Sequence, residues 1–97
     1  MVDQEVLYQF LSFQQGLPLA NVDAPSIAFE IARALPEQIV RTWKVLPFKV
    51  ADGSLFVASP EIPGLETSRA LRGFTALDVR FHLITPDSFE ALAEALL

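Results

Sequence analysis

A chain of 97 residues with 52% hydrophobic and 20% charged residues has enough apolar surface to close one core, but seldom enough for two. Its net charge of -5 disfavours nucleic acid polymers and anionic lipid as partners. It has no cysteine for disulfides or thiolate metal sites, and no apolar run approaches the roughly 20 residues that span a bilayer, so we expect no direct membrane insertion.

The first expected element is a helix over residues 3–15, with Asp3 as its N-cap and Gly16 as its stop signal. Apolar residues recur there at helical spacing: Val6, Leu7, Phe10, Leu11 and Phe13. The apolar stretch 17–22 then predicts a short strand, with Pro18 at its first position or on an edge.

Two short helices are expected next. Asp23 can cap a turn in which Pro25 takes the first helical position, and a mixed apolar pattern continues to residue 35. Pro36 cannot continue that hydrogen-bond ladder but fits the start of a new helix over 36–43.

A β-hairpin over 45–51 and 54–59 is the clearest local signal, because Asp52-Gly53 supplies the positive φ angles of a type I′ turn. If Ala51 pairs with Ser54, then Val50 faces Leu55 and Phe48 faces Val57, which places four large apolar side chains on one side. Lys49 and Phe56 then point to the other, partly covered face.

The rest of the chain predicts a helix over 64–72, a strand over 79–83 and a helix over 86–96 capped by Thr85. The predicted fold class is therefore α+β, a single small domain in which about three to four strands pack with helices.

Groups that could carry chemistry are sparse. His82 is the only histidine and has no cysteine or serine motif beside it, so we assign it no role. The scattered carboxylates are explained by caps and solvation, and we expect no enzyme, no metal and no cofactor. Trp43 and Lys44 could anchor a partner, although Trp43 fits equally a residue that closes the core.

Four short motifs occur in an order typical of one family. They are QQGLPL at 14–19, ALP at 34–36, KVLPF at 44–48 and LFVASP at 55–60. In this order they resemble the N-terminal domain of type II secretion and type IV pilus ATPases, also called the MshEN domain. The segment 72–92 resembles the branch appended to bacterial membrane glycosyltransferases of the phage-adsorption-protein type.

Some MshEN domains bind cyclic di-GMP through consecutive motifs that end in LxxxLxxQ. By this resemblance, Leu7, Leu11 and Gln14 match the end of one such motif, and residues 1–15 would be the tail of an upstream helical motif. The first half of that motif is absent, as is the whole of the other. Leu7 and Leu11 are equally explained as core residues one helical turn apart.

The resemblance implies a non-catalytic accessory domain over residues 1–97 that docks a larger ATPase or glycosyltransferase to a membrane-associated protein partner in the cytoplasm. The alternative is a fragment of a cyclic di-GMP sensor, whose nucleotide site upstream residues would complete. We expect nucleotide binding only in a longer chain.

Overall fold

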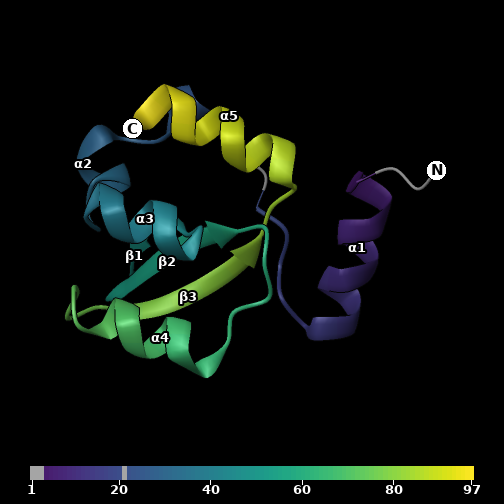
Figure 1. Ribbon diagram of the computed structural model, residues 1–97, viewed down its shortest axis with the longest axis horizontal. Helices are drawn as coiled ribbons and strands as arrows, with labels where there is room; N and C mark the ends of the chain where they lie inside the picture. The colour runs from purple at the N-terminus through teal and green to yellow at the C-terminus, as the bar shows by residue number, and fades with distance from the viewer. Residues whose placement is uncertain (1–3, 21) are drawn as a thin grey trace.

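The computed structural model describes residues 4–20 and 22–97 (Figure 1). The helices are α1 (Gln4–Gln15), the short 3-10 helix η1 (Ala24–Ser26), α2 (Phe29–Ala32), α3 (Glu37–Trp43), α4 (Leu65–Arg72) and α5 (Pro86–Leu96). The strands are β1 (Leu46–Ala51), β2 (Ser54–Ser59) and β3 (Asp78–Leu83). The α+β class and the four long predicted helices are thus confirmed, while the proposed cap Asp3 lies outside the described residues.

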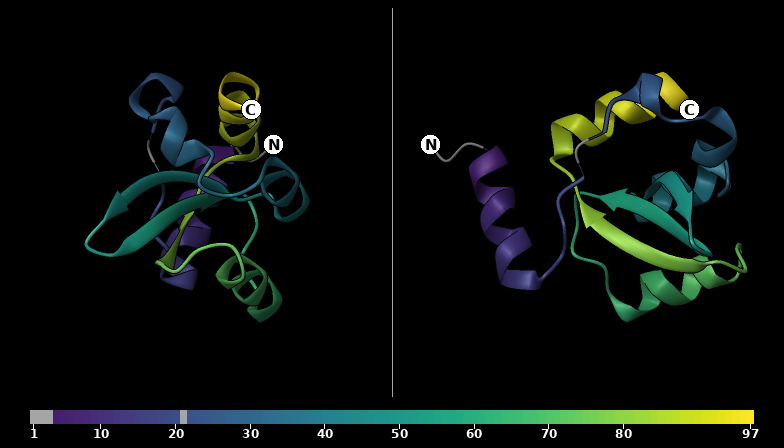
Figure 2. Two further views of the ribbon diagram at one scale, coloured as in Figure 1. Left: turned by 90° about the vertical axis from the view of Figure 1, so that its left-hand side faces the viewer. Right: turned by 180° about the vertical axis from the view of Figure 1, so that it is seen from behind.

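The sheet has the order β1-β2-β3, with β1 antiparallel to β2 and β2 parallel to β3. Parallel neighbours need a crossover connection, and α4 lies within the one that joins β2 to β3. Viewed from behind, β2 and β3 lie in front with no helix drawn across them (Figure 2, right). One face of the sheet is therefore open.

The hairpin turn forms as predicted, with Asp52 and Gly53 at φ angles of 52° and 74°. Ala51 pairs with Ser54 and Val50 with Leu55, also as predicted. The predicted pairing of Phe48 with Val57 is wrong, because a bulge inserts a residue between Pro47 and Lys49 and Val57 pairs with Pro47 instead.

The bulge turns Phe48 to the same side as Phe56. Their ring centroids are 6.3 Å apart, so the predicted apolar row on the opposite side loses one member. Val50 is another departure, since 44% of its surface is exposed although Leu55 opposite it is fully buried.

The strand predicted over 17–22 is reduced to a single parallel bridge between Leu19 and Leu83. The backbone of Leu83 accepts a hydrogen bond from Ala20 (2.6 Å) and donates one to Pro18 (2.8 Å). Pro18 has no N–H to extend a ladder, which limits the pairing. Asn21 within the predicted range lies outside the described residues.

The predicted helix before Pro36 divides into η1 and α2. Asp23 does stand at the N-cap position of η1, but its backbone carbonyl accepts the bonds from Ser26 and its side chain makes no capping bond. Thr85 is a true cap: its hydroxyl accepts a bond from the Ser88 N–H at 3.4 Å, as the sequence predicts.

Buried apolar side chains from the sheet and from α2 to α5 form one core. Its fully buried members include Leu35, Leu46, Leu55, Val57 and Leu71. Burial of such side chains contributes about 1.5 to 3 kcal/mol each. None of the helices in the described ranges is long and apolar enough to cross a membrane.

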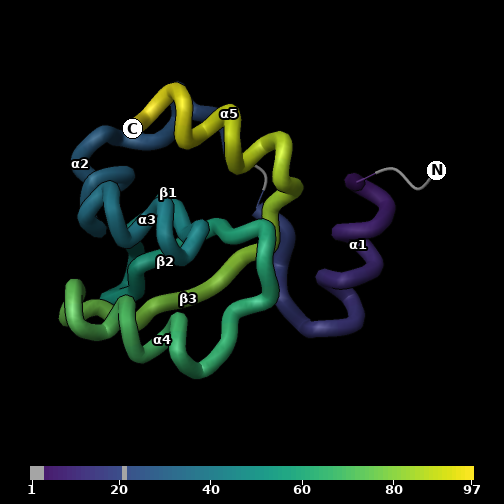
Figure 3. The backbone as a smooth tube through the Cα atoms, viewed as in Figure 1, coloured from purple at the N-terminus to yellow at the C-terminus, as the bar shows by residue number. Residues whose placement is uncertain are grey.

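α1 is the exception to this packing, because none of its described side chains is buried. The backbone trace leads from α1 through Gly16 to the strands and leaves α1 at one end of the molecule (Figure 3). The positive φ of Gly16, 68°, ends the helix and turns the chain toward Leu19.

Candidate functional site

α1 is attached to the body of the domain through polar contacts. The Tyr8 hydroxyl donates a hydrogen bond of 2.5 Å to the carbonyl of Pro60, across 52 residues of sequence. At the end of the helix, the Ser12 hydroxyl donates to the carbonyl of Leu17, whose own N–H donates to the Ser12 carbonyl at 3.1 Å. These contacts hold one side of α1 toward the sheet.

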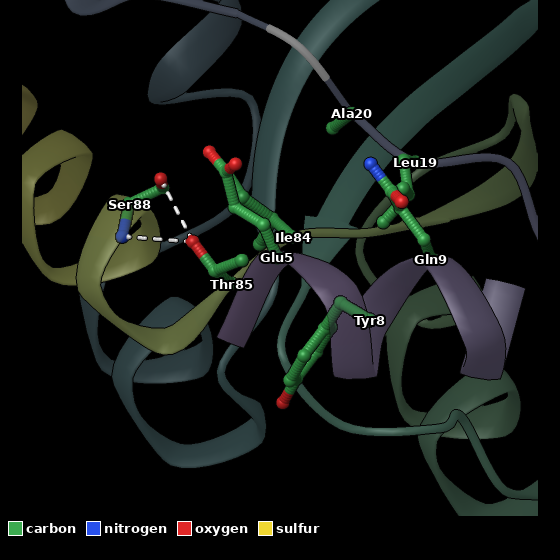
Figure 4. Close-up of a pocket in the computed structure, with 8 residues that line it drawn as sticks. All are labelled: Glu5, Tyr8, Gln9, Leu19, Ala20, Ile84, Thr85 and Ser88. Atoms are coloured by element: carbon green, nitrogen blue, oxygen red, sulfur yellow. Dashed lines mark hydrogen bonds between the residues drawn. The ribbon is translucent and has the colours of Figure 1, made fainter. Parts of the chain in front are cut away.

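A cavity of about 360 Å³ lies between α1 and the junction of β3 with α5 (Figure 4). Its lining comes from α1, the bridge segment and the start of α5: Glu5, Tyr8, Gln9, Leu19, Ala20, Ile84, Thr85 and Ser88. The Thr85 and Ser88 hydroxyls are 2.9 Å apart, and both serve the cap of α5.

The cavity suits binding better than reaction. Its two ionisable groups are Glu5 and Tyr8, and the pKa of Tyr8 is raised, first by burial and then by the charge of Glu61. A phenol with a raised pKa stays protonated at neutral pH and cannot act as a base. No pair of groups suited to nucleophilic catalysis meets in this cavity.

The outer side of α1 carries an apolar stripe. Val6, Phe10 and Phe13 are 58%, 61% and 89% exposed. At about 100° per residue these three lie within one narrow sector, almost opposite Tyr8. The stripe therefore faces away from the body that Tyr8 contacts.

The three residues of the partial nucleotide motif lie beside this stripe. Leu7 is 44% exposed, Leu11 is half-buried and Gln14 is exposed. None of the three lines the cavity, so they are not brought together with Thr85 and Ser88.

Trp43 and Lys44 lie apart from α1. Trp43 is half-buried and packs against the core, and Lys44 ends α3 with a φ of 53°. The Lys44 ammonium lies 3.5 Å from the carboxylate of Glu61, with both side chains more than half exposed. Such a surface pair contributes little to stability.

His82 packs edge-on against two rings on the open face of the sheet. Its ring centroid lies 5.2 Å from that of Phe48 and 5.6 Å from that of Phe56. Burial lowers the pKa of His82, and the charge of Lys49 lowers it further. Within the described ranges, no three histidine or acidic side chains gather as a metal site.

Sequence patterns did not reveal the contact of Tyr8 with Pro60 or the cavity beside it. Both depend on residues far apart in the chain, and Tyr8 alone carries no motif. Its position on the side of the helix opposite the apolar residues was the one available sign.

Comparison with known proteins identifies the fold. A family model described as the MshEN domain matches residues 15–97. A structure of MshE with cyclic di-GMP is similar with a TM-score of 0.82 at 18% identity, over 99% of this chain and 70% of that one. The N-terminal domain of XpsE is similar in two crystal forms, with TM-scores of 0.75 and 0.73 at 20% and 21% identity.

These two XpsE matches cover 99% and 98% of this chain and 68% and 67% of theirs. No curated protein sequence matches the chain. Identities this low establish the fold alone, but the family model covers most of the sequence and agrees with the order of the four short motifs. The chain belongs to the MshEN domain family.

Proposed function

We propose that this domain is a non-catalytic regulatory and docking module in the cytoplasm, part of a larger secretion ATPase or membrane glycosyltransferase. Its partner is a membrane-associated protein, and its main contact is the apolar stripe of α1. The observation that carries the proposal is the exposure of Phe10 and Phe13 on a helix whose other side is attached to the body.

A helix that lays an apolar face against a partner gains from large anchor side chains, and aromatic residues dominate such contacts. Val6, Phe10 and Phe13 recur at the spacing of such anchors. The bond from Tyr8 to Pro60 supports the proposal, because it orients the helix and reduces the entropy lost on docking.

Site-specific photo-crosslinking in the parent protein tests this docking role. A photoreactive residue at Phe13 is expected to give an adduct with a protein of the membrane fraction, whereas the same residue at Asp52, in the exposed hairpin turn, gives none. Equal adducts at both positions, or none at Phe13, would contradict the proposal. A third position at Lys44 tests the smaller anchor formed with Trp43.

A second candidate function is a part of a cyclic di-GMP sensor. It is favoured by the fold shared with MshE in its structure with cyclic di-GMP and by the positions of Leu7, Leu11 and Gln14 on the accessible side of α1. Residues 1–15 would then be the tail of an upstream helical motif that completes the pocket.

Titration calorimetry separates the two candidates. Residues 1–97 are expected to show no measurable affinity for cyclic di-GMP, and only a longer chain with the upstream motif would bind it. Micromolar binding by residues 1–97 would contradict this division and assign the nucleotide site to the domain itself.

A further inference from the structure

The open face of the sheet carries a row of three side chains that no ion pair explains. In the sheet register, Lys49 on β1 pairs with Phe56 on β2, and Phe56 pairs with Arg80 on β3. Paired residues of neighbouring strands point to the same face, so the row reads cation, aromatic ring, cation. The charges lie on the two outer strands, with the ring between them.

The rings beside this row form a half-buried platform. Phe48 and His82 contact Phe56 and each other, and the Lys49 ammonium lies 5.4 Å from the Phe56 ring centroid. Phe56 is half-buried although no helix is drawn across it (Figure 2, right). We name the five residues Phe48, Lys49, Phe56, Arg80 and His82 the sheet platform.

The cations of the platform are available for a partner. Lys49 and Arg80 are exposed and form no ion pair with any described residue. By contrast, Arg41 and Lys44 are paired with acidic side chains. Asp78, two residues before Arg80 on the same face, is the acidic residue nearest in register, and it forms no ion pair with Arg80.

The net charge of the chain does not oppose an acidic ligand at this place. Charges are screened over about 8 Å at physiological ionic strength, so a docked group senses mainly Lys49 and Arg80. The lowered pKa of His82 keeps the ring between them neutral and apolar at neutral pH.

We propose that the sheet platform docks an acidic segment of a partner protein, with a large apolar side chain against Phe48 and Phe56 and carboxylates at Lys49 and Arg80. The two cations stand on strands separated by two sheet spacings, about 10 Å, which suits carboxylates on either side of one apolar residue. This inference rests on the docking function proposed above and adds a second contact to it.

Nuclear magnetic resonance titration of the isotope-labelled chain tests the platform. The probe is a synthetic peptide of about ten residues, composed of glutamate, leucine and phenylalanine, beside a matched peptide with lysine at every glutamate position. The acidic peptide is expected to shift the amide signals of the five platform residues, and the basic peptide to leave them unchanged.

Two double variants give the matched comparison. K49Q/R80Q is expected to weaken binding of the acidic peptide about fivefold or more, because two exposed charge contacts are lost. R69Q/R72Q removes the same charge from α4, outside the platform, and is expected to change binding less than about twofold.

Equal weakening by both double variants, or shifts confined to other residues, would overturn the proposal. Shifts of the platform by a mononucleotide or inorganic phosphate but not by the acidic peptide would assign the face to a small anion and overturn it as well. Failure of the peptide with crosslinking at Phe13 intact refutes the platform alone, whereas loss of crosslinking refutes the docking function itself.

Discussion

The attachment of α1 to the body is the weakest joint of the domain, and the variant Tyr8→Phe isolates it. The substitution removes the hydroxyl that donates to the Pro60 carbonyl and keeps the ring. Pro60 is half-buried, so water can reach its carbonyl and the loss is that of an ordinary hydrogen bond, about 1 kcal/mol. At 25 °C this corresponds to about a fivefold change in an equilibrium constant.

Hydrogen exchange reads this change residue by residue. A helix of 12 residues is marginal by itself, and none of the described side chains of α1 is buried. We therefore expect the α1 amides of Y8F to exchange about fivefold faster, with the amides of β2 unchanged. Serine 12 offers a matched control, because Ser12→Ala removes a hydroxyl whose partner, Leu17, lies just beyond the same helix.

The control is expected to affect the last turn of α1 and not its middle. Equal acceleration in α1 and β2 of Y8F would show that the helix and sheet unfold as one unit, and unchanged exchange in α1 would show that the Tyr8 bond holds nothing. Either result refutes the account of α1 as a separately attached element.

Three further predictions concern the body. Leu55→Ala should lower the free energy of unfolding in urea by about 2 to 5 kcal/mol, since Leu55 is fully buried, whereas Val50→Ala at a 44% exposed position should lower it by less than about 1 kcal/mol. Gly53→Ala should lower it by about 1 to 2 kcal/mol, because alanine is strained at a φ of 74°; an unchanged urea midpoint would contradict that turn. His82 should titrate below its ordinary pKa in proton resonance spectra, with Lys49→Gln raising the pKa toward the ordinary value. Because the folded pKa is the lower one, His82 should favour folding above about pH 6.5 and lose that contribution as the pH falls through the folded pKa; a pKa unaffected by K49Q would exclude the Lys49 charge as a cause.

Local signals predicted most of the elements correctly. Thr85 followed by Pro86 defines the start of α5, and Asp52-Gly53 defines the hairpin turn, because cap and turn preferences depend on a few adjacent residues. The family resemblance is likewise confirmed, since it rests on motifs within one stretch of chain.

Errors arose where tertiary packing decides. The bulge at Phe48 redirects a side chain that strict alternation places on the other face, and no residue type in the hairpin announces it. The stretch around Leu19 looks like a strand, but it meets β3 at one bridge because Pro18 cannot donate.

The candidate contacts were the least predictable part. Helical spacing correctly grouped the apolar residues of α1, yet an apolar stripe of a helix ordinarily packs into its own core. That Phe10 and Phe13 face outward depends on the distant contact of Tyr8 with Pro60, which spacing cannot reveal.

Recruitment to membranes measures the central claim, that the stripe of α1 is a docking surface. The parent protein with Phe10→Ser and Phe13→Ser is compared with one carrying Phe29→Ser and Phe74→Ser, two aromatic residues that are 59% and 48% exposed elsewhere. The α1 variant is expected to unfold at the same urea concentration as the original chain and to lose recruitment about tenfold or more, while the control keeps it. Equal recruitment of both variants, with the α1 variant folded, would contradict the claim.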